Sequence, residues 1–305
     1  MIKNDILLIK IIFEKGLKLM STKVKVNLLG FLTVLFWAIA FPFSKITISH
    51  FNINSVAVLR CGIASIFLCL LGYKKISLPK KQDIPKFFIS GLFGFFLYLV
   101  FFNTGLQSLT SATSSIIIAT TPIMASIVST FLYQEKIKWL GWIAIFIEFI
   151  GIIVLSLWNG IFSLNFGILW TLCAAAVFCI YNLYQRKLSA LGYQPNEIVT
   201  YSMICGTILL LFFLPKGISE FVTAPSMQMF VILSLGIFSS AIAYILWGKA
   251  LAIAEKTSDV TNFMFLTPLL STILGFLLLK EIPSMGTFIG GTMILIGMVL
   301  FQFGK

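Results

Sequence analysis

Two stretches of the chain, TPIMASIVSTFLYQE at residues 121–135 and TPLLSTILGFLLLKE at residues 267–281, share one framework. In each stretch a proline is followed 13 positions later by a glutamate. A glycine follows 16 positions after that glutamate, beyond the end of the stretch. These residues are Pro122, Glu135 and Gly151 in the first copy, and Pro268, Glu281 and Gly297 in the second. The copies lie 146 residues apart in a chain of 305 residues, which predicts a single structural unit present twice.

The composition indicates a membrane protein. Hydrophobic residues make up 59% of the chain and charged residues 10%, with a mean hydropathy of +1.04, whereas a soluble domain carries about a quarter of charged residues. The net charge of +12 does not indicate nucleic acid, because no basic stripe and no soluble domain is present to bind it. The expected partners are therefore the lipid bilayer and a small-molecule substrate.

The reactive side chains give no sign of catalysis or of a cofactor. The five cysteines all fall inside apolar runs, no CxxC occurs, and His50 is the only histidine. Such cysteines are expected to be small buried hydrophobes. We expect no catalytic residue, no metal site and no cofactor.

The apolar runs are long enough for ten membrane spans, since a span takes about 20 residues at about 1.5 Å rise per residue. The predicted spans are 26–48, 54–73, 86–106, 110–133, 138–158, 164–186, 196–214, 228–248, 257–279 and 285–304.

The basic residues indicate the orientation of these spans. With the N-terminus in the cytoplasm, 18 of the 22 basic residues fall on the inner face and only Lys216 and Lys280 on the outer one, while Lys45 and Arg60 lie within spans. This bias follows the positive-inside rule and predicts that both termini are cytoplasmic. Residues 1–25 are expected to be a cytoplasmic or interfacial N-terminal segment. The alternative is that translation starts at Met20, so that residues 1–19 belong to an overlong gene start; the sequence leaves both open.

An odd number of spans in each unit turns the second unit upside down relative to the first. The predicted fold is thus an all-α integral membrane protein with ten transmembrane helices in a 5+5 inverted repeat, the repeats covering residues 26–158 and 164–304. Inverted repeats are typical of carriers that work by alternating access. Tyr98 and Tyr244 also lie 146 residues apart, which supports the alignment of the repeats.

The repeated residues have different expected roles. Pro122 and Pro268 each remove a backbone hydrogen bond in mid-span, so we expect kinks that border a cavity. Glu135 and Glu281 are expected at opposite faces, each capping the N-terminus of the next helix. The small faces around Gly151, Gly290 and Gly297 allow close helix packing, either within the bundle or across a homodimer interface.

Three charged side chains lie within predicted spans. Lys45 and Arg60 either extend to the outer surface or face inward, where they could bind a substrate carboxylate or phosphate or hold an external gate. Glu148 is the one carboxylate near mid-membrane; it is either a proton-coupling group or a neutral acid hydrogen-bonded between helices. Aromatic and amide residues within spans are further candidates to line a substrate pocket: Trp37, Tyr98, Trp170, Tyr181, Asn182, Tyr244, Trp247 and Asn262.

Several of these motifs resemble the EamA family of the drug/metabolite transporter superfamily. FWAIAFPFSK at residues 36–45 resembles the first helix of the family, and Val58-Leu59-Arg60 resembles its arginine-bearing second helix. The two Pro-to-Glu helices, together with Gly151 and Gly297, resemble the ends of the family's two repeats. The match covers residues 27–304, although Ala38 stands where a glycine often follows the tryptophan, and span six has Ala174 where span one has Trp37. The resemblance implies a ten-helix carrier, in many members an exporter of amino acids or other small metabolites.

The leading hypothesis is a secondary transporter in a bacterial inner membrane that exports amino acids or related amphipathic solutes. The sequence contains no Walker motif, so nothing in it indicates that ATP is used directly. The alternatives are carriers of nucleotide-like compounds, sugars or drugs, and a passive channel. An intramembrane enzyme would need clustered catalytic groups, which the sequence does not provide.

Overall fold

The computed structural model describes residues 21–72, 76–133, 137–158, 166–254, 260 and 262–303, and every regular element among them is a helix. The predicted interfacial segment at the N-terminus lies almost entirely outside the described residues. The α-helices are α2 Thr22–Ile48, α3 Ile53–Gly72, α4 Ile84–Gly91, α5 Tyr98–Leu106, α6 Ser111–Ala119, α7 Thr121–Tyr133, α8 Trp139–Leu157, α9 Phe166–Ala190, α10 Pro195–Leu210, α11 Leu214–Val222, α12 Ser226–Ser234, α13 Ala243–Ile253, α15 Leu266–Leu279 and α16 Met285–Phe303.

Among the described residues, six continuous helical stretches are long and apolar enough to cross a membrane. They are Thr22–Ile48, Ile53–Gly72, Lys81–Leu106, Phe166–Ala190, Pro195–Val222 and Ser226–Ile253. Four shorter apolar helices accompany them, at Ser111–Ala125, Trp139–Leu155, Phe263–Leu279 and Met285–Phe301. The helix α11 was not predicted from the sequence; it has Pro215 in its first turn, where the fixed φ of proline suits a helix.

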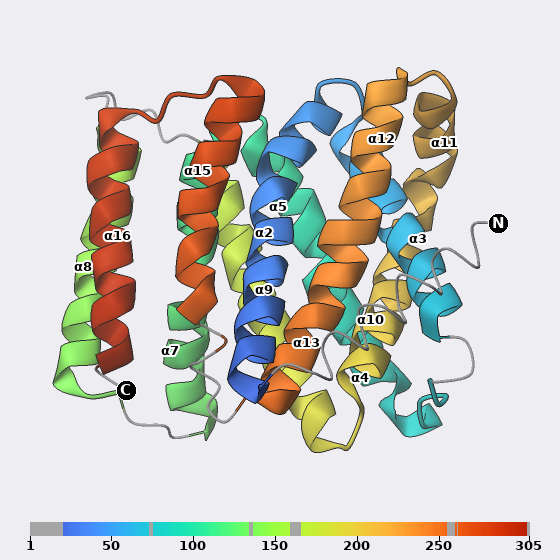
Figure 1. The fold of residues 1–305 in the computed structure, drawn as a ribbon, viewed down its shortest axis with the longest axis horizontal. Helices are drawn as coiled ribbons and strands as arrows, with labels where there is room; N and C mark the ends of the chain where they lie inside the picture. The colour runs from blue at the N-terminus through green and yellow to red at the C-terminus, as the bar shows by residue number, and fades with distance from the viewer. Residues whose placement is uncertain are drawn as a thin grey trace.

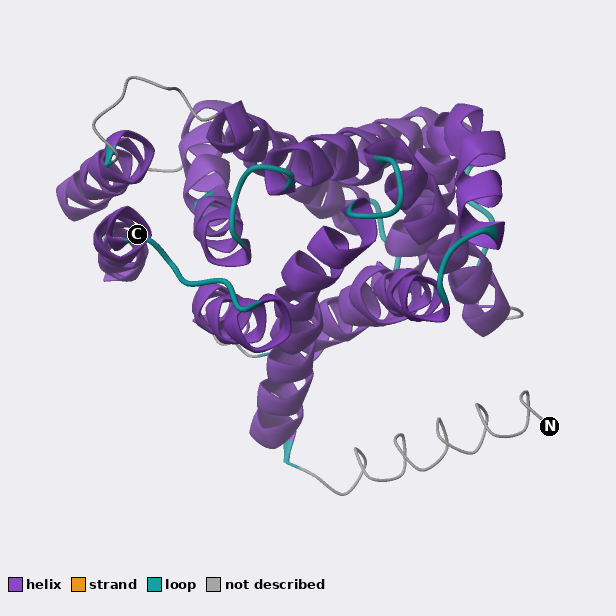
Figure 2. Cartoon of the chain, turned by 90° about the horizontal axis from the view of Figure 1, so that it is seen from above, coloured by secondary structure: helices purple, strands orange, loops and turns teal. Residues whose placement is uncertain are grey.

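The long helices run side by side, and successive ones alternate in direction (Figure 1). α2 begins and α16 ends on the same face of the bundle, the lower one in Figure 1, and α2 and α15 both end on the upper face. Seen from above, α8 and α16 form a pair at one edge of the molecule (Figure 2). The remaining helices form the main body, in which helices of both sequence halves intermingle.

Four helices depart from regular α geometry at matched places in the two halves. A π-helical segment, η2 (Leu92–Leu97), ends directly before Tyr98, and another, η4 (Leu235–Ile242), ends two residues before Tyr244. α6 stops at Ala119 and α7 starts at Thr121, just before Pro122. In the same way a 3₁₀ turn, η5 (Asn262–Phe265), gives way to α15 just before Pro268. Prolines and π segments are the usual causes of such irregularities.

Glycines allow α8 and α16 to pack closely. A Cβ atom at Gly151 would lie 2.8 Å from the carbonyl oxygen of Gly290, and one at Gly290 would lie 2.6 Å from the carbonyl oxygen of Gly151. A Cβ atom at Gly297 would collide with Cγ of Glu148. The small-residue faces therefore pack against each other within the chain.

On the lower face, the loop after α3 is bound to the turn between α9 and α10. The Tyr193 hydroxyl donates to Oδ2 of Asp83 at 2.8 Å and accepts from the backbone N–H of Lys80 at 3.0 Å. Partial burial raises the pKa of Tyr193, which favours the protonated, donating form. Glu197 accepts from the backbone N–H of Gln194 at 2.8 Å, capping α10, and from that of Ser77 at 3.0 Å. These bonds tie the first half of the chain to the second.

Candidate functional site

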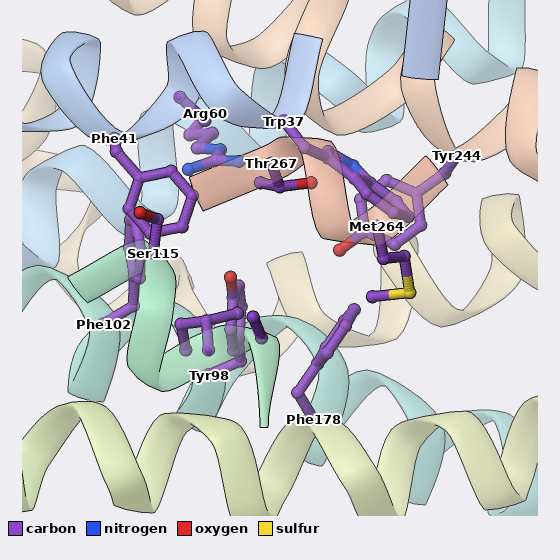
Figure 3. A pocket seen from close by; sticks show the side chains of 13 residues that line it. Trp37, Phe41, Arg60, Tyr98, Phe102, Ser115, Phe178, Tyr244, Met264 and Thr267 are labelled. Atoms are coloured by element: carbon purple, nitrogen blue, oxygen red, sulfur yellow. The ribbon is translucent and has the colours of Figure 1, made fainter. Parts of the chain in front are cut away.

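A cavity lies in the main body, walled by α2, α3, α5 and α6 from the first half and by α9, α13 and α15 with η5 from the second (Figure 3). Its empty space, counting the part open to solvent, is about 570 Å³. The described lining residues are Trp37, Ala40, Phe41, Arg60, Tyr98, Phe102, Ser115, Ile118, Ala119, Phe178, Tyr244, Met264 and Thr267. A mostly apolar cavity with a few polar groups is typical of a small-molecule site.

Arg60 is the charged residue among the described lining residues. It is only 5% exposed, and its guanidinium is directed toward the cavity (Figure 3). Nε donates to Oγ of Ser240 at 2.5 Å, and an Nη atom makes a long contact of 3.4 Å with Oγ of Ser44. In the described part of the chain, no ion pair includes Arg60. A buried cation held by neutral hydroxyls creates a strong preference for an anion in the cavity.

Aromatic rings form most of the remaining wall. Tyr98 lies 4.8 Å from Phe178 between ring centroids and stacks on Phe102 at 5.5 Å. Across the cavity, the ring of Trp37 contacts that of Tyr244 edge to face at 5.4 Å. Figure 3 shows the Tyr98 hydroxyl pointing toward the side of the cavity that holds Arg60. Trp37 Nε1 is buried and has no hydrogen-bond partner within the described structure.

The two proline-linked breaks border the cavity, since Ile118 and Met264, each four residues before a proline, line it. Proline has no N–H, so neither residue's carbonyl receives the usual helical hydrogen bond. In the first half the Thr121 hydroxyl donates to the carbonyl oxygen of Ile118 at 2.7 Å. Thr267 occupies the matching position in the second half, but its side chain lines the cavity. The second break thus presents the Thr267 hydroxyl to the cavity, and the carbonyl of Met264 lacks the donor that residue 268 would supply in a regular helix.

Lys45 and Glu281 meet above the cavity. Their side chains form an ion pair of 2.5 Å between Nζ and Oε1, and Nζ also donates to the carbonyl oxygen of Leu109 at 2.8 Å. The other carboxylate oxygen of Glu281 accepts from the backbone N–H of Ser111, at the start of α6, at 2.7 Å. Glu281 therefore caps α6 of the first half, not the following helix α16. We call this arrangement of Lys45, Leu109, Ser111 and Glu281 the upper clamp.

The backbone around Glu281 directs its carboxylate into the upper clamp. Lys280 has a positive φ of 57°, and the N–H of Glu281 bonds back to the carbonyl oxygen of Gly275 at 3.2 Å. This is a helix C-terminal turn that usually uses glycine at the left-handed position. Gly275 leaves the space that the folded-back side chain needs, because a Cβ atom there would lie 2.9 Å from Oε2 of Glu281.

Other predicted residues lie away from the cavity lining. Tyr181 is buried among aromatic rings, and Trp247 packs on Trp37 at 5.1 Å between centroids. Trp170 packs against Phe101 at 5.4 Å. Asn182, in α9, is half-buried and is not a lining residue. Glu135 and the side chain of Asn262 lie outside the described residues.

Glu148 lies in the α8–α16 pair, and it is not among the described residues that line the cavity. It is only 3% exposed, and Oε1 has no hydrogen-bond partner within the described structure. An apolar cluster joins this pair to α6: Ile116 and Ala119 of α6 pack with Ala144 of α8 and Ile294 of α16.

Sequence reasoning found Trp37, Arg60, Tyr98 and Tyr244 of the lining and missed the others. Two of the missed residues carried a usable signal: Ile118 and Met264 lie one turn before the paired prolines. Thr267 is directly beside Pro268 and could have been inferred in the same way. Nothing in the sequence distinguished Phe41, Phe102 or Phe178 from the many other phenylalanines of the chain.

A bundle of apolar helices from both sequence halves around a shared cavity is typical of a helical membrane transporter. Comparison with known families agrees: the model of the EamA-like transporter family matches residues 24–157 and again residues 165–303. The chain belongs to the EamA-like transporter family, which confirms the resemblance found in the sequence. It is an integral membrane protein of a transporter family, not of an enzyme family.

Individual relatives extend this comparison. The chain is 30% identical over 275 residues to an uncharacterized transporter, YdfC, of Bacillus subtilis, with 88% of each chain covered. It is 27% identical over 272 residues to a probable terminal-alkyne amino-acid exporter of Streptantibioticus cattleyicolor, covering 89% of this chain and 91% of the relative. A protein of known crystal structure has the same fold, with a TM-score of 0.62 at 16% identity, over 93% of this chain and 99% of the other.

Proposed function

We propose that this protein is a secondary transporter that exports amino acids or related amphipathic solutes by alternating access. The observation that carries the proposal is Arg60, a buried guanidinium in an aromatic cavity whose protein partners are the hydroxyls of Ser240 and Ser44. A guanidinium held in this way can bind a carboxylate through its remaining N–H groups. The relative named as a probable amino-acid exporter supports this substrate class.

The rest of the cavity suits the other parts of an amino acid. Thr267 offers a hydroxyl and Met264 a carbonyl without its helical donor, and both are acceptors for an ammonium group. The faces of Tyr98, Tyr244 and Phe178 attract a cation as well and also cover an apolar side chain. The carboxylate at Arg60 and the ammonium near the Pro268 break would orient the solute across the cavity.

Topology and mechanism complete the proposal. Ten spans in a 5+5 inverted repeat, with both termini in the cytoplasm of a bacterial cell, agree with the basic residues at the start of α2, in the loop after α3, before α8 and near the end of α9, which are all on the lower face in Figure 1. The upper face is then extracytoplasmic, and the upper clamp closes the cavity toward it. Release of the clamp, with closure at the lower face, would give alternating access.

The test is a binding and transport panel. Purified protein is heated in detergent with each of the twenty amino acids, and the solutes that raise the melting temperature are then assayed for counterflow in proteoliposomes. We expect at least one amino acid to stabilise the wild-type protein and Arg60→Met to abolish that shift. Arg186→Met, which removes a positive charge outside the cavity lining, is the matched control and should keep it. Failure of the whole panel with wild-type protein would refute the amino-acid assignment, and currents far above carrier turnover would favour a channel.

A further inference from the structure

The π-helical segment η4 holds the cavity cation through one side chain. Its residue Ser240 is 3% exposed and accepts a hydrogen bond of 2.5 Å from Nε of Arg60, although the two residues are 180 positions apart in the chain. Ser240 comes from the second half and Arg60 from the first, so the bond joins the two halves at the cavity wall. A π-helical turn shifts the register of the helix by part of a turn, and such segments often occur at functional sites.

Several contacts hold η4 in this place. The neighbouring Ser239 donates to the carbonyl oxygen of Phe36 in α2 at 2.7 Å. One turn earlier, Gly236 lies against α3, where an added Cβ atom would be 3.2 Å from the carbonyl oxygen of Arg60 and closer still to Ile63. The close approach of the two backbones brings a side chain as short as that of serine within reach of Nε. Ser240 is therefore fixed independently of the Arg60 side chain.

The geometry leaves the outer end of the guanidinium available to a solute. Arginine has five N–H donors. Ser240 takes the one on Nε, and Ser44 makes a long contact of 3.4 Å with one on Nη1. Serine is a neutral acceptor, so it orients the guanidinium without cancelling its charge, as a carboxylate partner would. The orientation matters because a carboxylate binds two parallel N–H groups of arginine only in a restricted plane.

We propose that Ser240 is a positioning residue that holds Arg60 in the plane needed to bind a substrate carboxylate, and that it thereby sets the preference of the cavity for carboxylates over their neutral analogues. This inference rests on the proposed function. It assigns Ser240 no contact with the solute; its effect passes through Arg60. It also explains why the π-helical turn lies beside the cavity: it presents Ser240 to α3 and, at the same time, Ser239 to α2.

The experiment compares carboxylate and amide ligands. Binding of phenylalanine, leucine, phenylalaninamide and leucinamide to the purified full-length protein is measured by calorimetry and thermal shift for wild type, Ser240→Ala and Ser240→Thr. A hydrogen bond to a charged group is strong enough for a loss of about tenfold in affinity. We expect Ser240→Ala to weaken binding of the amino acids by about tenfold and to leave the amides unchanged. Ser240→Thr, which keeps the hydroxyl, should keep the wild-type ratio.

Each other result overturns a specific statement. An equal loss for amino acids and amides in Ser240→Ala would mean a merely structural role for Ser240, and an unchanged amino-acid affinity would mean no role. In both cases the proposed function would stand, because wild-type protein would still bind amino acids. If neither phenylalanine nor leucine binds wild-type protein, this inference fails, whereas the proposed substrate class fails only if the whole panel of twenty amino acids fails. Binding of the amides serves as the check that each variant is folded.

Discussion

Neutralising Glu281 is expected to open the cavity toward the upper face. Glu281→Gln removes the ion pair with Lys45 and weakens the bond to the N–H of Ser111, yet keeps the size of the side chain. The upper clamp lies about 6 Å above the cavity, since Lys45 is four residues beyond Phe41 in α2 at about 1.5 Å per residue. It joins α2, α6 and the end of α15, and all three helices line the cavity.

The size of the effect follows from the burial of the pair. The side chains of Lys45 and Glu281 are 28% and 11% exposed, so the pair is neither fully buried nor a surface pair. Hydrogen bonds to charged groups contribute about 1.5–3 kcal/mol, and solvent screening lowers this range. We take about 2 kcal/mol for the clamp, which corresponds to a change of about 30-fold in the ratio of closed to open molecules.

The assay measures access to the cavity from outside. A cysteine at Ser115, a lining residue one turn below the upper clamp, is introduced into a chain whose five native cysteines have been replaced. A membrane-impermeant maleimide is added to intact cells, and the labelling rate should rise about 30-fold in Glu281→Gln if labelling follows the open fraction. Lys216→Met is the control, because it breaks an exposed ion pair of 3.8 Å with Glu220 on the same face.

Two results would refute the reasoning. An unchanged labelling rate in Glu281→Gln would mean that the clamp does not hold the cavity closed. An equal increase in the Lys216→Met control would mean that any charge loss on this face loosens the bundle. A double-mutant cycle with Lys45→Met checks the pairing itself: the effects of the two substitutions should be strongly non-additive, because each removes the same interaction.

Three further predictions concern single side chains. Glu148→Gln should leave transport and its pH dependence unchanged, because Glu148 is in the α8–α16 pair and not among the lining residues. If the variant lost the proton dependence of transport in proteoliposomes, Glu148 would be a proton-coupling group after all. Gly290→Ala should destabilise the protein by about 1–3 kcal/mol through a clash in the same pair, while Gly62→Ala, with open space around its Cβ, should raise the melting temperature slightly. Trp37→Phe should lower the melting temperature slightly, because the smaller ring loses part of its contact with Tyr244 and Trp247, and it should weaken substrate binding severalfold in calorimetry if the indole N–H contacts the solute.

The sequence predicted the large-scale features well because they are repeated. The spacing of Pro122 and Pro268 in the two halves identified the helices that break at the cavity, and the shared offset of Tyr98 and Tyr244 identified two of its aromatic walls. A repeated spacing needs no knowledge of the neighbouring helices. Features that depend on a residue present in only one half, such as Arg60, had no second copy to support their prediction.

The partners of the charged residues could not be predicted from the sequence. The depth of Lys45 in its span could be counted, but Glu281 lies 236 residues further along the chain and was expected to cap α16. The same limit applies to Glu148, since α8 is apolar on nearly every face and its sequence does not reveal which side meets α16. The π-helical segments also lack a local signal, because their residues LFGFFL and LGIFSSAI suit an ordinary apolar helix.

The cavity combines a repeated backbone with chemistry that is not repeated. Both halves supply a proline-linked break and a tyrosine, yet the freed carbonyl of the first break is occupied by the Thr121 hydroxyl, whereas Thr267 of the second break faces the cavity. Arg60 belongs to the first half alone and is held by Ser240 of the second. A repeated backbone lets the two halves exchange conformations, while groups present only once give the solute a single orientation. In the proposed mechanism, the direction of the solute would therefore be set by Arg60 and the Pro268 break, and the conformational exchange would depend on the helices that both halves share.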